Sequence, residues 1–187
     1  MDKLKTKLQY AEDFARKKHS GQLKKDGVTL ITSHLEDVVL RLKSLSILDE
    51  DVLCAGWLHD ILEGTNTSVE EIEELFGKKI TTLVLTLTKD NMLPKNRRDS
   101  QYIIKLKSAS LEAKLVKICD IFSNLKDVHR SDFPNSKTVK KIMRYFNPIQ
   151  NEIIESVPVY PSLSNMIDDI NDIIVKYGLR PISQHRS

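Results

Sequence analysis

Hydrophobic positions recur at helical spacing along nearly the whole chain. Five apolar residues near the N-terminus fall on one face of a helix over about residues 3–19: Leu4, Leu8, Ala11, Phe14 and Ala15. The next stretch, "SGQLKKDGVTLITS", has two glycines and several turn residues, so it predicts a loop. The helical pattern resumes at about His34.

Helix-boundary signals are clearest over residues 68–77. Ser68 is a typical N-cap, Glu71 three residues later completes a capping box, and Gly77 is a stop signal. The segment "KITTLVLTLT" that follows is β-branched enough for a strand, but a lone strand would have no partner, so we predict a buried helix. Further helices are expected over about residues 51–62, 97–108, 111–130, 136–157 and 162–177, with a kink at Pro148. The pattern predicts an all-α protein of about eight helices.

Composition and length fit one globular domain. We expect a single domain over residues 1–180 and a flexible tail over 181–187, which includes His185. The chain of 187 residues is 40% hydrophobic and 29% charged, and no stretch is long and apolar enough for a membrane span or a signal sequence. Cys54 and Cys119 lie in apolar surroundings, which is typical of buried, reduced thiols. We therefore expect a cytoplasmic protein with no membrane partner.

Two apolar segments each contain an acid. The run "VLCAGWLHDIL" includes His59 and Asp60, and "KLVKICDIFSNL" includes Asp120. A lone Asp of this kind more often turns outward or caps a helix, because an uncompensated buried carboxylate costs several kcal/mol. Together with His34, however, these residues supply two imidazoles and two carboxylates to one divalent metal, and this set suits Mn²⁺, Zn²⁺ or Fe²⁺ better than Ca²⁺. Neutral core histidines are the alternative.

Glu63 lies one helical turn beyond His59 and would share its helix face. A carboxylate beside a metal can orient a bound water or take its proton, which is the chemistry of metal-assisted hydrolysis. Taken alone, Glu63 is more typical of a solvated residue near a helix end. His19, at the end of the first helix, fits an ordinary packing or capping role.

Basic residues gather in two places, over residues 16–25 and 95–98. Lys24 and Lys25 lie in a glycine-flanked loop just before His34, so they indicate a polyanionic, phosphorylated substrate. The segment Arg16–Lys18 is typical of a solvated helix face. The net charge is only +3 and aromatic residues are 6% of the chain, with none interleaved in either cluster, so nucleic acid is a poor fit.

The order of six motifs resembles the HD-superfamily hydrolase domain of the Rel/Spo stringent-response proteins. The motifs are "HSGQLKK", "ITSHL", "LHDILEGT", "FGKKITTLVLTLTK", "LPKNRR" and "KLVKICDIFSNLKD". The resemblance spans about residues 7–150 and is greatest to the stand-alone small alarmone hydrolases. It implies an all-α HD-domain helical bundle. It also implies an Mn²⁺-dependent 3′-pyrophosphohydrolase that converts guanosine 3′,5′-bis(diphosphate), or its pentaphosphate form, to GDP or GTP and pyrophosphate.

The resemblance also implies roles for individual residues. The implied metal ligands are His34, His59, Asp60 and Asp120. Glu63 matches the first acid of a Glu-Asp pair that handles the attacking water. The implied nucleotide contacts are Lys24 and Lys25 in the basic loop, Asn124 near the ribose, Asp127 one turn further, and Lys95 and Arg98 at the distal phosphates.

Three positions depart from the family pattern. Gly64 stands where the second acid belongs, Leu30 replaces an aromatic residue of the nucleotide pocket, and Leu35 replaces a proline. These changes affect catalytic rate and base recognition more than fold. Two alternatives follow: a phosphohydrolase of another 3′-phosphorylated nucleotide such as NADPH, or a nucleotide-binding sensor with weakened catalysis. If only the second acid is missing, Gly64→Asp should raise hydrolysis.

Overall fold

The computed structural model describes residues 5–24, 26–131 and 135–183. Within these ranges the chain folds into eleven helical segments and no strand, which confirms the all-α prediction; the nearest approach to a sheet is an isolated antiparallel bridge between Leu23 and Leu30. The helices are α1 (Lys7–Lys18), α2 (Ile31–Ser44), α3 (Glu50–Leu58), α4 (Ile61–Gly64), α5 (Val69–Phe76), α6 (Lys78–Leu87), α7 (Lys95–Lys107), α8 (Leu111–Arg130), α9 (Ser136–Phe146), α10 (Gln150–Glu155) and α11 (Ser162–Val175). None of them is both long and apolar enough to cross a lipid bilayer.

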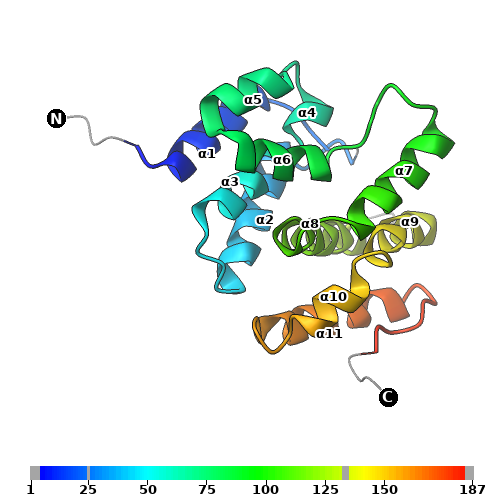
Figure 1. Cartoon of the computed structure of the whole chain (residues 1–187). Coiled ribbons are helices and arrows are strands. Elements are labelled where there is room, and N and C mark those ends of the chain that lie inside the picture. Colours follow the sequence, from blue (N-terminus) through cyan, green and yellow to red (C-terminus); the bar gives the residue numbers. More distant parts are fainter. Residues whose placement is uncertain (1–4, 25, 132–134, 184–187) are drawn as a thin grey trace.

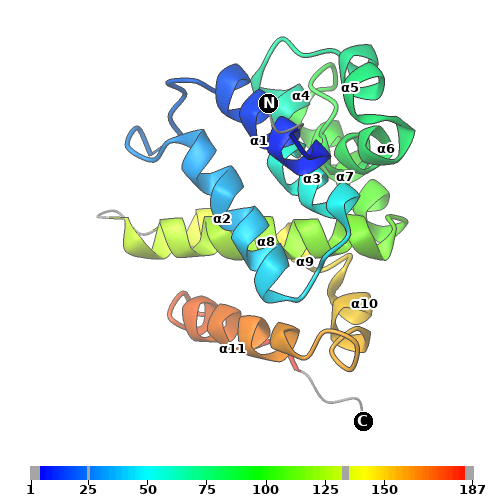
Figure 2. The ribbon, with the colours of Figure 1, turned by 90° about the vertical axis from the view of Figure 1, so that its left-hand side faces the viewer.

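Helix α8 is the axis of the fold. It contacts α2, α3 and α6 on one side and α9, α10 and α11 on the others. Figures 1 and 2 show it running through the middle of the molecule, with α11 on the opposite side from α1, α3 and α5. The Ser110 side chain accepts a hydrogen bond from the Ala113 N–H and so caps the start of α8.

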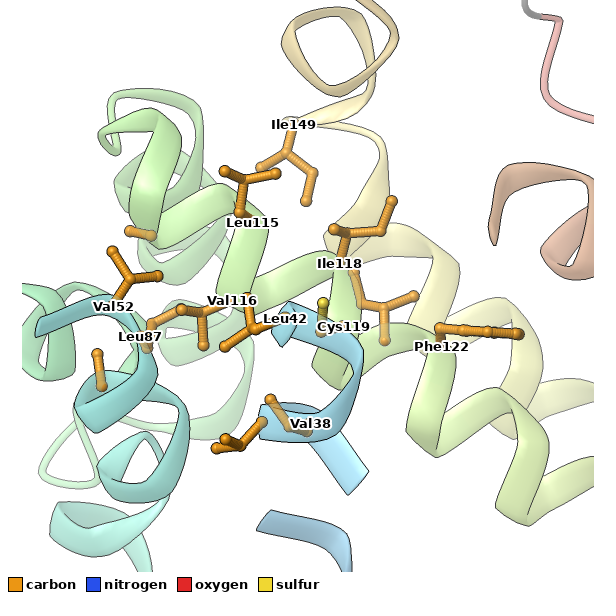
Figure 3. Close-up of a cluster of buried hydrophobic side chains, with 14 of the residues drawn as sticks. Val38, Leu42, Val52, Leu87, Leu115, Val116, Ile118, Cys119, Phe122 and Ile149 are labelled. Carbon is orange, nitrogen blue, oxygen red and sulfur yellow. The ribbon is translucent and has the colours of Figure 1, made fainter. Parts of the chain in front are cut away.

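The core forms where α2, α3 and α6 pack against α8 (Figure 3). Its side chains come from several helices: Val38 and Leu42 from α2, Val52 from α3, Leu87 from α6, and Val116 and Cys119 from α8. Each is almost fully buried. Burial of one such aliphatic side chain contributes roughly 1.5–3 kcal/mol, so this packing fixes the relative positions of the helices that hold the polar residues described below.

The β-branched segment after Gly77 is helical, as predicted. Gly77 has φ +83°, a conformation that glycine adopts readily, and it separates α5 from α6. Threonine hydroxyls within α6 donate to carbonyls one turn earlier, for example Thr82 to Lys78 at 2.8 Å and Thr86 to Thr82 at 2.7 Å. These bonds satisfy the hydroxyl groups inside a helix, so the segment needs no strand partner.

Two predicted helices are each broken into two, and both predictions were therefore wrong in detail. The helix expected over 136–157 ends at Phe146 and restarts at Gln150. Pro148 causes this break, because it has no N–H to donate and its ring would clash with the backbone carbonyl four residues earlier in a continuous helix. The helix expected over 51–62 breaks at His59 and Asp60. Asp60 has φ −98° and ψ −1°, a sparsely populated region in which active-site residues are often found.

Ile182, just past the predicted domain boundary at residue 180, packs against α11. Ile182 is buried, its N–H donates to Asn171 Oδ1 at 2.6 Å, and its carbonyl accepts from Asn171 Nδ2 at 3.1 Å. These bonds attach it to α11. Residues 184–187, which include His185, lie outside the described residues.

Candidate metal and substrate site

His34, His59 and Asp120 meet where α2, α3 and α8 come together. Their side chains offer three ligand atoms within 4.8 Å of one another, and all three residues are buried. His34 Nε2 lies 3.2 Å from Asp120 Oδ1, and His59 Nε2 lies 3.7 Å from the same oxygen. Two imidazole nitrogens and a carboxylate oxygen at these separations form a donor set that can hold a divalent metal ion.

The orientation of His59 is fixed by the helix that ends at it. Its Nδ1 lies 2.8 Å from the Gly56 carbonyl, which can only accept, so Nδ1 carries the proton. In the neutral ring, Nε2 therefore keeps a free electron pair that can bind a metal, and it lies on the side of Asp120. It is buried and has no hydrogen-bond partner among the described residues. A buried polar nitrogen without a partner costs free energy, and a bound metal ion would remove that cost. Nε2 of His59 is therefore suited to be a metal ligand.

Asp60 lies beside this group and not fully within it. Its Oδ2 is 3.6 Å from His59 Nε2, and its side chain is 38% exposed. The break between α3 and α4 places His59 at the end of one helix and Asp60 at the start of the next, so both point to one place. Of the four predicted ligands, the structure joins three closely and puts the fourth at their edge.

The carboxylates of the site shift the pKa values of the groups around them. Burial raises the pKa of Asp120, but the ammonium of Lys117 at 2.6 Å and the two imidazoles outweigh burial and hold that pKa well below its ordinary value. Burial lowers the pKa of His59, yet the carboxylates of Asp60 and Asp120 outweigh it and raise the pKa to about 9. At neutral pH in the metal-free protein, His59 Nε2 therefore takes up a second proton, and a metal ion bound there would replace that proton.

Glu63 is anchored by the segment that follows α6. Its Oε1 accepts a hydrogen bond of 2.7 Å from the Lys89 backbone N–H, and its Oε2 lies 3.9 Å from Lys89 Nζ. The side chain is 24% exposed. Glu63 is thus held one turn from His59, with one carboxylate oxygen free of a close partner among these contacts.

Three of the predicted substrate contacts lie together beside the metal group. Lys24 Nζ donates to Asp127 Oδ2 at 2.5 Å and to Asn124 Oδ1 at 2.9 Å, and it lies 3.4 Å from His34 Nδ1. Asn124 Nδ2 in turn donates to Asp120 Oδ1 at 2.5 Å. The loop before α2 and the C-terminal half of α8 therefore form one polar wall. Lys25 lies outside the described residues.

The other two predicted contacts occupy a different setting. Lys95 is exposed at the first turn of α7. Arg98 donates from Nη2 to the carbonyls of Asn91 and Leu93, each at 3.1 Å. The contacts described for Arg98 thus hold the loop before α7 in place, and none of them joins Lys95 or Arg98 to the metal group.

Two lysines at the site were missed by the sequence reasoning. Lys117 is buried, bonds to Asp120, and lies with its ammonium 5.2 Å from the centre of the Tyr102 ring. Lys89 stacks on the same ring at 4.7 Å and is the partner of Glu63. A signal for Lys117 was present, because it lies three residues before Asp120 in an apolar helix, where a cation needs an anion. Lys89 had no such signal, since it follows a helix end.

Leu30 and Leu35, two of the residues that differ from the family pattern, lie in different surroundings. Leu30 is the N-cap residue of α2 and is 44% exposed, so it offers an apolar surface near Lys24 and His34. Leu35 is fully buried in α2 and belongs to the core. The proline that Leu35 replaces would remove a backbone donor inside this helix, so the change is compatible with the fold.

Residues 11–152 match the family model described as HD domain, and the chain therefore belongs to the HD domain family. Within that family it is 34% identical over 145 residues to a zebrafish (Danio rerio) protein named guanosine-3′,5′-bis(diphosphate) 3′-pyrophosphohydrolase MESH1, covering 72% of this chain and 75% of that protein. The human (Homo sapiens) protein of the same name is 35% identical over 138 residues, covering 73% and 76%.

A solved structure shares the fold over nearly the whole length. It is described as "A metazoan ortholog of SpoT hydrolyzes ppGpp and plays a role in starvation responses", and it matches with a TM-score of 0.75 and 29% identity, covering 96% of this chain and 100% of that one. The predicted relationship to small alarmone hydrolases is confirmed by these relatives.

Proposed function

We propose that this chain is a metal-dependent hydrolase that removes the 3′-pyrophosphate of guanosine tetraphosphate and pentaphosphate, giving GDP or GTP and pyrophosphate. The observation that supports this most directly is the buried group of His34, His59 and Asp120, with the polar wall of Lys24 beside it and Glu63 one helical turn along the chain from His59. The named activity of the relatives supports the same reaction.

We propose Mn²⁺ as the metal, held by His34, His59, Asp120 and, at the edge, Asp60. A divalent ion bound to imidazole nitrogens and carboxylate oxygens lowers the pKa of a coordinated water and polarises a phosphoryl oxygen. Two observations support this assignment: Nε2 of His59 has no hydrogen-bond partner among the described residues, and the lowered pKa of Asp120 keeps its carboxylate ionised. Both groups can therefore offer an electron pair to a cation.

Glu63 is proposed to orient the attacking water and accept its proton. The hydrogen bond from the Lys89 N–H fixes one carboxylate oxygen and leaves the other available. The Lys89 ammonium, 23% exposed and only loosely paired, adds positive charge where the departing pyrophosphate would gain negative charge.

The polar wall is proposed to hold the nucleotide. Without substrate, Lys24 is neutralised by Asp127, so a phosphate that binds here must displace that carboxylate. Only a strongly anionic group competes well in such an exchange. We also propose that Asn124 contacts the ribose, that Lys25, Lys95 and Arg98 serve the outer phosphates, and that exposed Leu30 faces the base in place of an aromatic ring.

We further propose that the protein acts in the cytoplasm on a free nucleotide. Cys54 and Cys119 are free and buried, and burial raises the pKa of the Cys54 thiol to about 12, which is typical of thiols with a packing role in a reducing compartment. The net charge of +3 and the absence of aromatic residues from the basic clusters support a small-molecule substrate over nucleic acid.

The test is chromatographic. Purified protein is incubated with guanosine 3′,5′-bis(diphosphate) and Mn²⁺, with and without EDTA, and GDP and pyrophosphate are measured. The expected result is GDP formation that stops with EDTA. A panel that includes NADPH, ranked by kcat/KM, decides between substrates: a preference for NADPH would replace the guanosine nucleotide. Tight binding without turnover, in folded and metal-loaded protein, would make it a sensor.

A further inference from the structure

The second ring nitrogen of His34 has a close partner on α8, the hydroxyl of Ser123. His34 Nδ1 lies 3.1 Å from Ser123 Oγ. Among the described residues, one other atom lies within hydrogen-bonding distance of Nδ1, and it is Lys24 Nζ at 3.4 Å. His34 and Ser123 are both buried, so the protein itself must supply the partner of this nitrogen.

The metal-free and the metal-bound ring make opposite demands on that partner. In the metal-free protein His34 Nε2 lies 3.2 Å from Asp120 Oδ1, which only accepts, so Nε2 carries a proton and Nδ1 can accept. A metal ion on Nε2 would replace this proton, and the neutral ring would then carry its proton on Nδ1. The ammonium of Lys24 cannot accept that proton, whereas a hydroxyl can both donate and accept. Ser123 is therefore the partner that serves Nδ1 in both forms.

The Ser123 hydroxyl proton has an acceptor of its own on α2, the carboxylate of Asp37, three residues after His34. Burial raises the pKa of Asp37, but hydrogen bonds from Arg41 and Ser123 outweigh burial and lower that pKa. Arg41 holds the carboxylate with two hydrogen bonds, from Nε at 2.8 Å and from Nη2 at 3.0 Å. When Ser123 accepts from His34, its own proton can therefore point to a carboxylate that is already held in place.

We propose that Ser123 is a positioning residue of the metal site, whose hydroxyl accepts the Nδ1 proton of His34 when a metal ion binds Nε2 and then donates to Asp37. Ser123 thus holds His34 in the tautomer that ligates through Nε2, and it keeps the ring in place when no metal is bound. Loss of such a supporting hydrogen bond typically costs about 10–100-fold in metal affinity. This inference rests on the proposed function.

Two substitutions of Ser123 give the first test. Ser123→Ala removes the acceptor for His34 Nδ1, whereas Ser123→Thr keeps a hydroxyl at the same position. We expect Ser123→Ala to weaken Mn²⁺ binding by roughly 10–100-fold and Ser123→Thr to restore most of the wild-type affinity. Isothermal titration calorimetry measures the affinities, and thermal unfolding without metal shows that both variants are folded. Wild-type Mn²⁺ affinity in folded Ser123→Ala would overturn the proposal.

The matched control is Ser156→Ala, which removes another buried hydroxyl. Ser156 directly follows α10, is 6% exposed, and donates its hydroxyl proton to the Glu152 carbonyl at 2.6 Å. We expect Ser156→Ala to bind Mn²⁺ as tightly as wild type. An equal loss of affinity in Ser123→Ala and Ser156→Ala would show a general effect of losing a buried hydroxyl, and the proposal would fail.

Hydrolysis at different metal concentrations gives a second test. Because Ser123 acts through His34 and not on the substrate, a saturating Mn²⁺ concentration should restore most of the kcat of Ser123→Ala for guanosine 3′,5′-bis(diphosphate). At limiting Mn²⁺ the same variant should be much less active than wild type. A kcat that stays low at every Mn²⁺ concentration would show that Ser123 does not act through metal binding, and would contradict the proposal.

A spectroscopic measurement is independent of turnover. Nitrogen-15 NMR of the histidine rings, assigned with His34→Gln, is recorded without metal and with Zn²⁺, which unlike Mn²⁺ is diamagnetic. The His34 proton should move from Nε2 to Nδ1 when Zn²⁺ binds. Ligation through Nδ1 would overturn the inference, whatever the activity. Wild-type protein that shows this proton shift, binds Mn²⁺ and does not hydrolyse the nucleotide would instead contradict the proposed function, so the two failures are distinguishable.

Discussion

Helix α8 buries two lysines one turn apart, and they face different neighbours. Lys114 pairs with Glu152 of α10, whose side chain is 44% exposed. Lys117 pairs with Asp120 on its own helix, and both of those side chains are less than one-tenth exposed. The first pair consists of one cation and one anion with water at its edge. The second belongs to a larger group that also includes two imidazoles and the carboxylate of Asp60.

The difference shows how to recognise a site among buried charges. The Lys114–Glu152 pair is complete in itself, and it joins α8 to α10. Around Asp120, the single ammonium of Lys117 faces two carboxylates, the pKa of His59 is raised, and His59 Nε2 has no hydrogen-bond partner among the described residues. Two carboxylates gathered around an imidazole nitrogen that has no hydrogen-bond partner indicate a cation site, whereas burial of charge alone does not.

The largest effect should come from Asp120→Asn. It removes a proposed metal ligand and leaves the buried Lys117 unpaired, so we expect loss of metal binding and of hydrolysis. The free energy of unfolding should fall by about 3–5 kcal/mol in the metal-free protein. Calorimetric metal titration and denaturant unfolding measure the two effects. Adding Lys117→Met should recover stability and not activity; recovery of both would show that Asp120 serves only to neutralise Lys117.

Glu63→Gln should separate chemistry from metal binding. The amide oxygen can still accept from the Lys89 N–H, but the side chain can no longer take a proton. We expect kcat to fall by roughly 10²–10⁴ with metal affinity unchanged. Steady-state kinetics and a parallel metal titration test this. Full activity in Glu63→Gln would show that Glu63 takes no part in catalysis and is a solvated residue near a helix end.

Metal binding should depend on pH in a direction set by His59. The pKa of His59 is raised to about 9 in the metal-free fold, so its stabilising contribution is complete below the ordinary histidine pKa of about 6.5 and is lost as pH rises through 9. A metal must displace that proton, so the rise in Tm on adding Mn²⁺ should grow between about pH 6.5 and 9. At a free metal concentration of 100 Kd the stabilisation is about 2.7 kcal/mol. A Tm shift that is constant with pH would argue against His59 as a ligand.

The smallest effect is expected at the other lysine of α8. Lys114→Met removes a buried cation whose partner, Glu152, can turn to water, so stability should change by no more than about 1 kcal/mol. Activity and metal affinity should equal wild type. These values are measured beside Asp120→Asn under the same conditions. A large loss of activity in Lys114→Met would erase the distinction between the two lysines.

Periodicity predicted most of the helices, because each buries one apolar face on α8 or its neighbours. It could not predict the break at His59 and Asp60, since the run "VLCAGWLHDIL" is almost continuously apolar and contains no proline. The break depends on how α3 and α4 pack, which is a tertiary effect. The proline break at residue 148 was anticipated, although as a kink.

The candidate site divides in a similar way. His34, His59 and Asp120 were predictable because polar residues in apolar helices need a reason to be there, and the family resemblance ordered them. Lys89 was not, since it reaches Glu63 only through the three-dimensional arrangement of the segment that follows α6. The loop-holding bonds of Arg98 were likewise invisible, because sequence shows a charge and not its partner.

The connection between α6 and α7 is held by hydrogen bonds at several points along its length, and these bonds restrict how it can change in evolution. The Lys89 N–H is bound to Glu63, the Thr88 carbonyl accepts from Lys105, and the carbonyls of Asn91 and Leu93 accept from Arg98. Surface connections usually tolerate inserted or deleted residues well. Here an inserted or deleted residue would displace the Lys89 N–H that binds the Glu63 carboxylate. We therefore expect this segment to vary in sequence among relatives far more than in length.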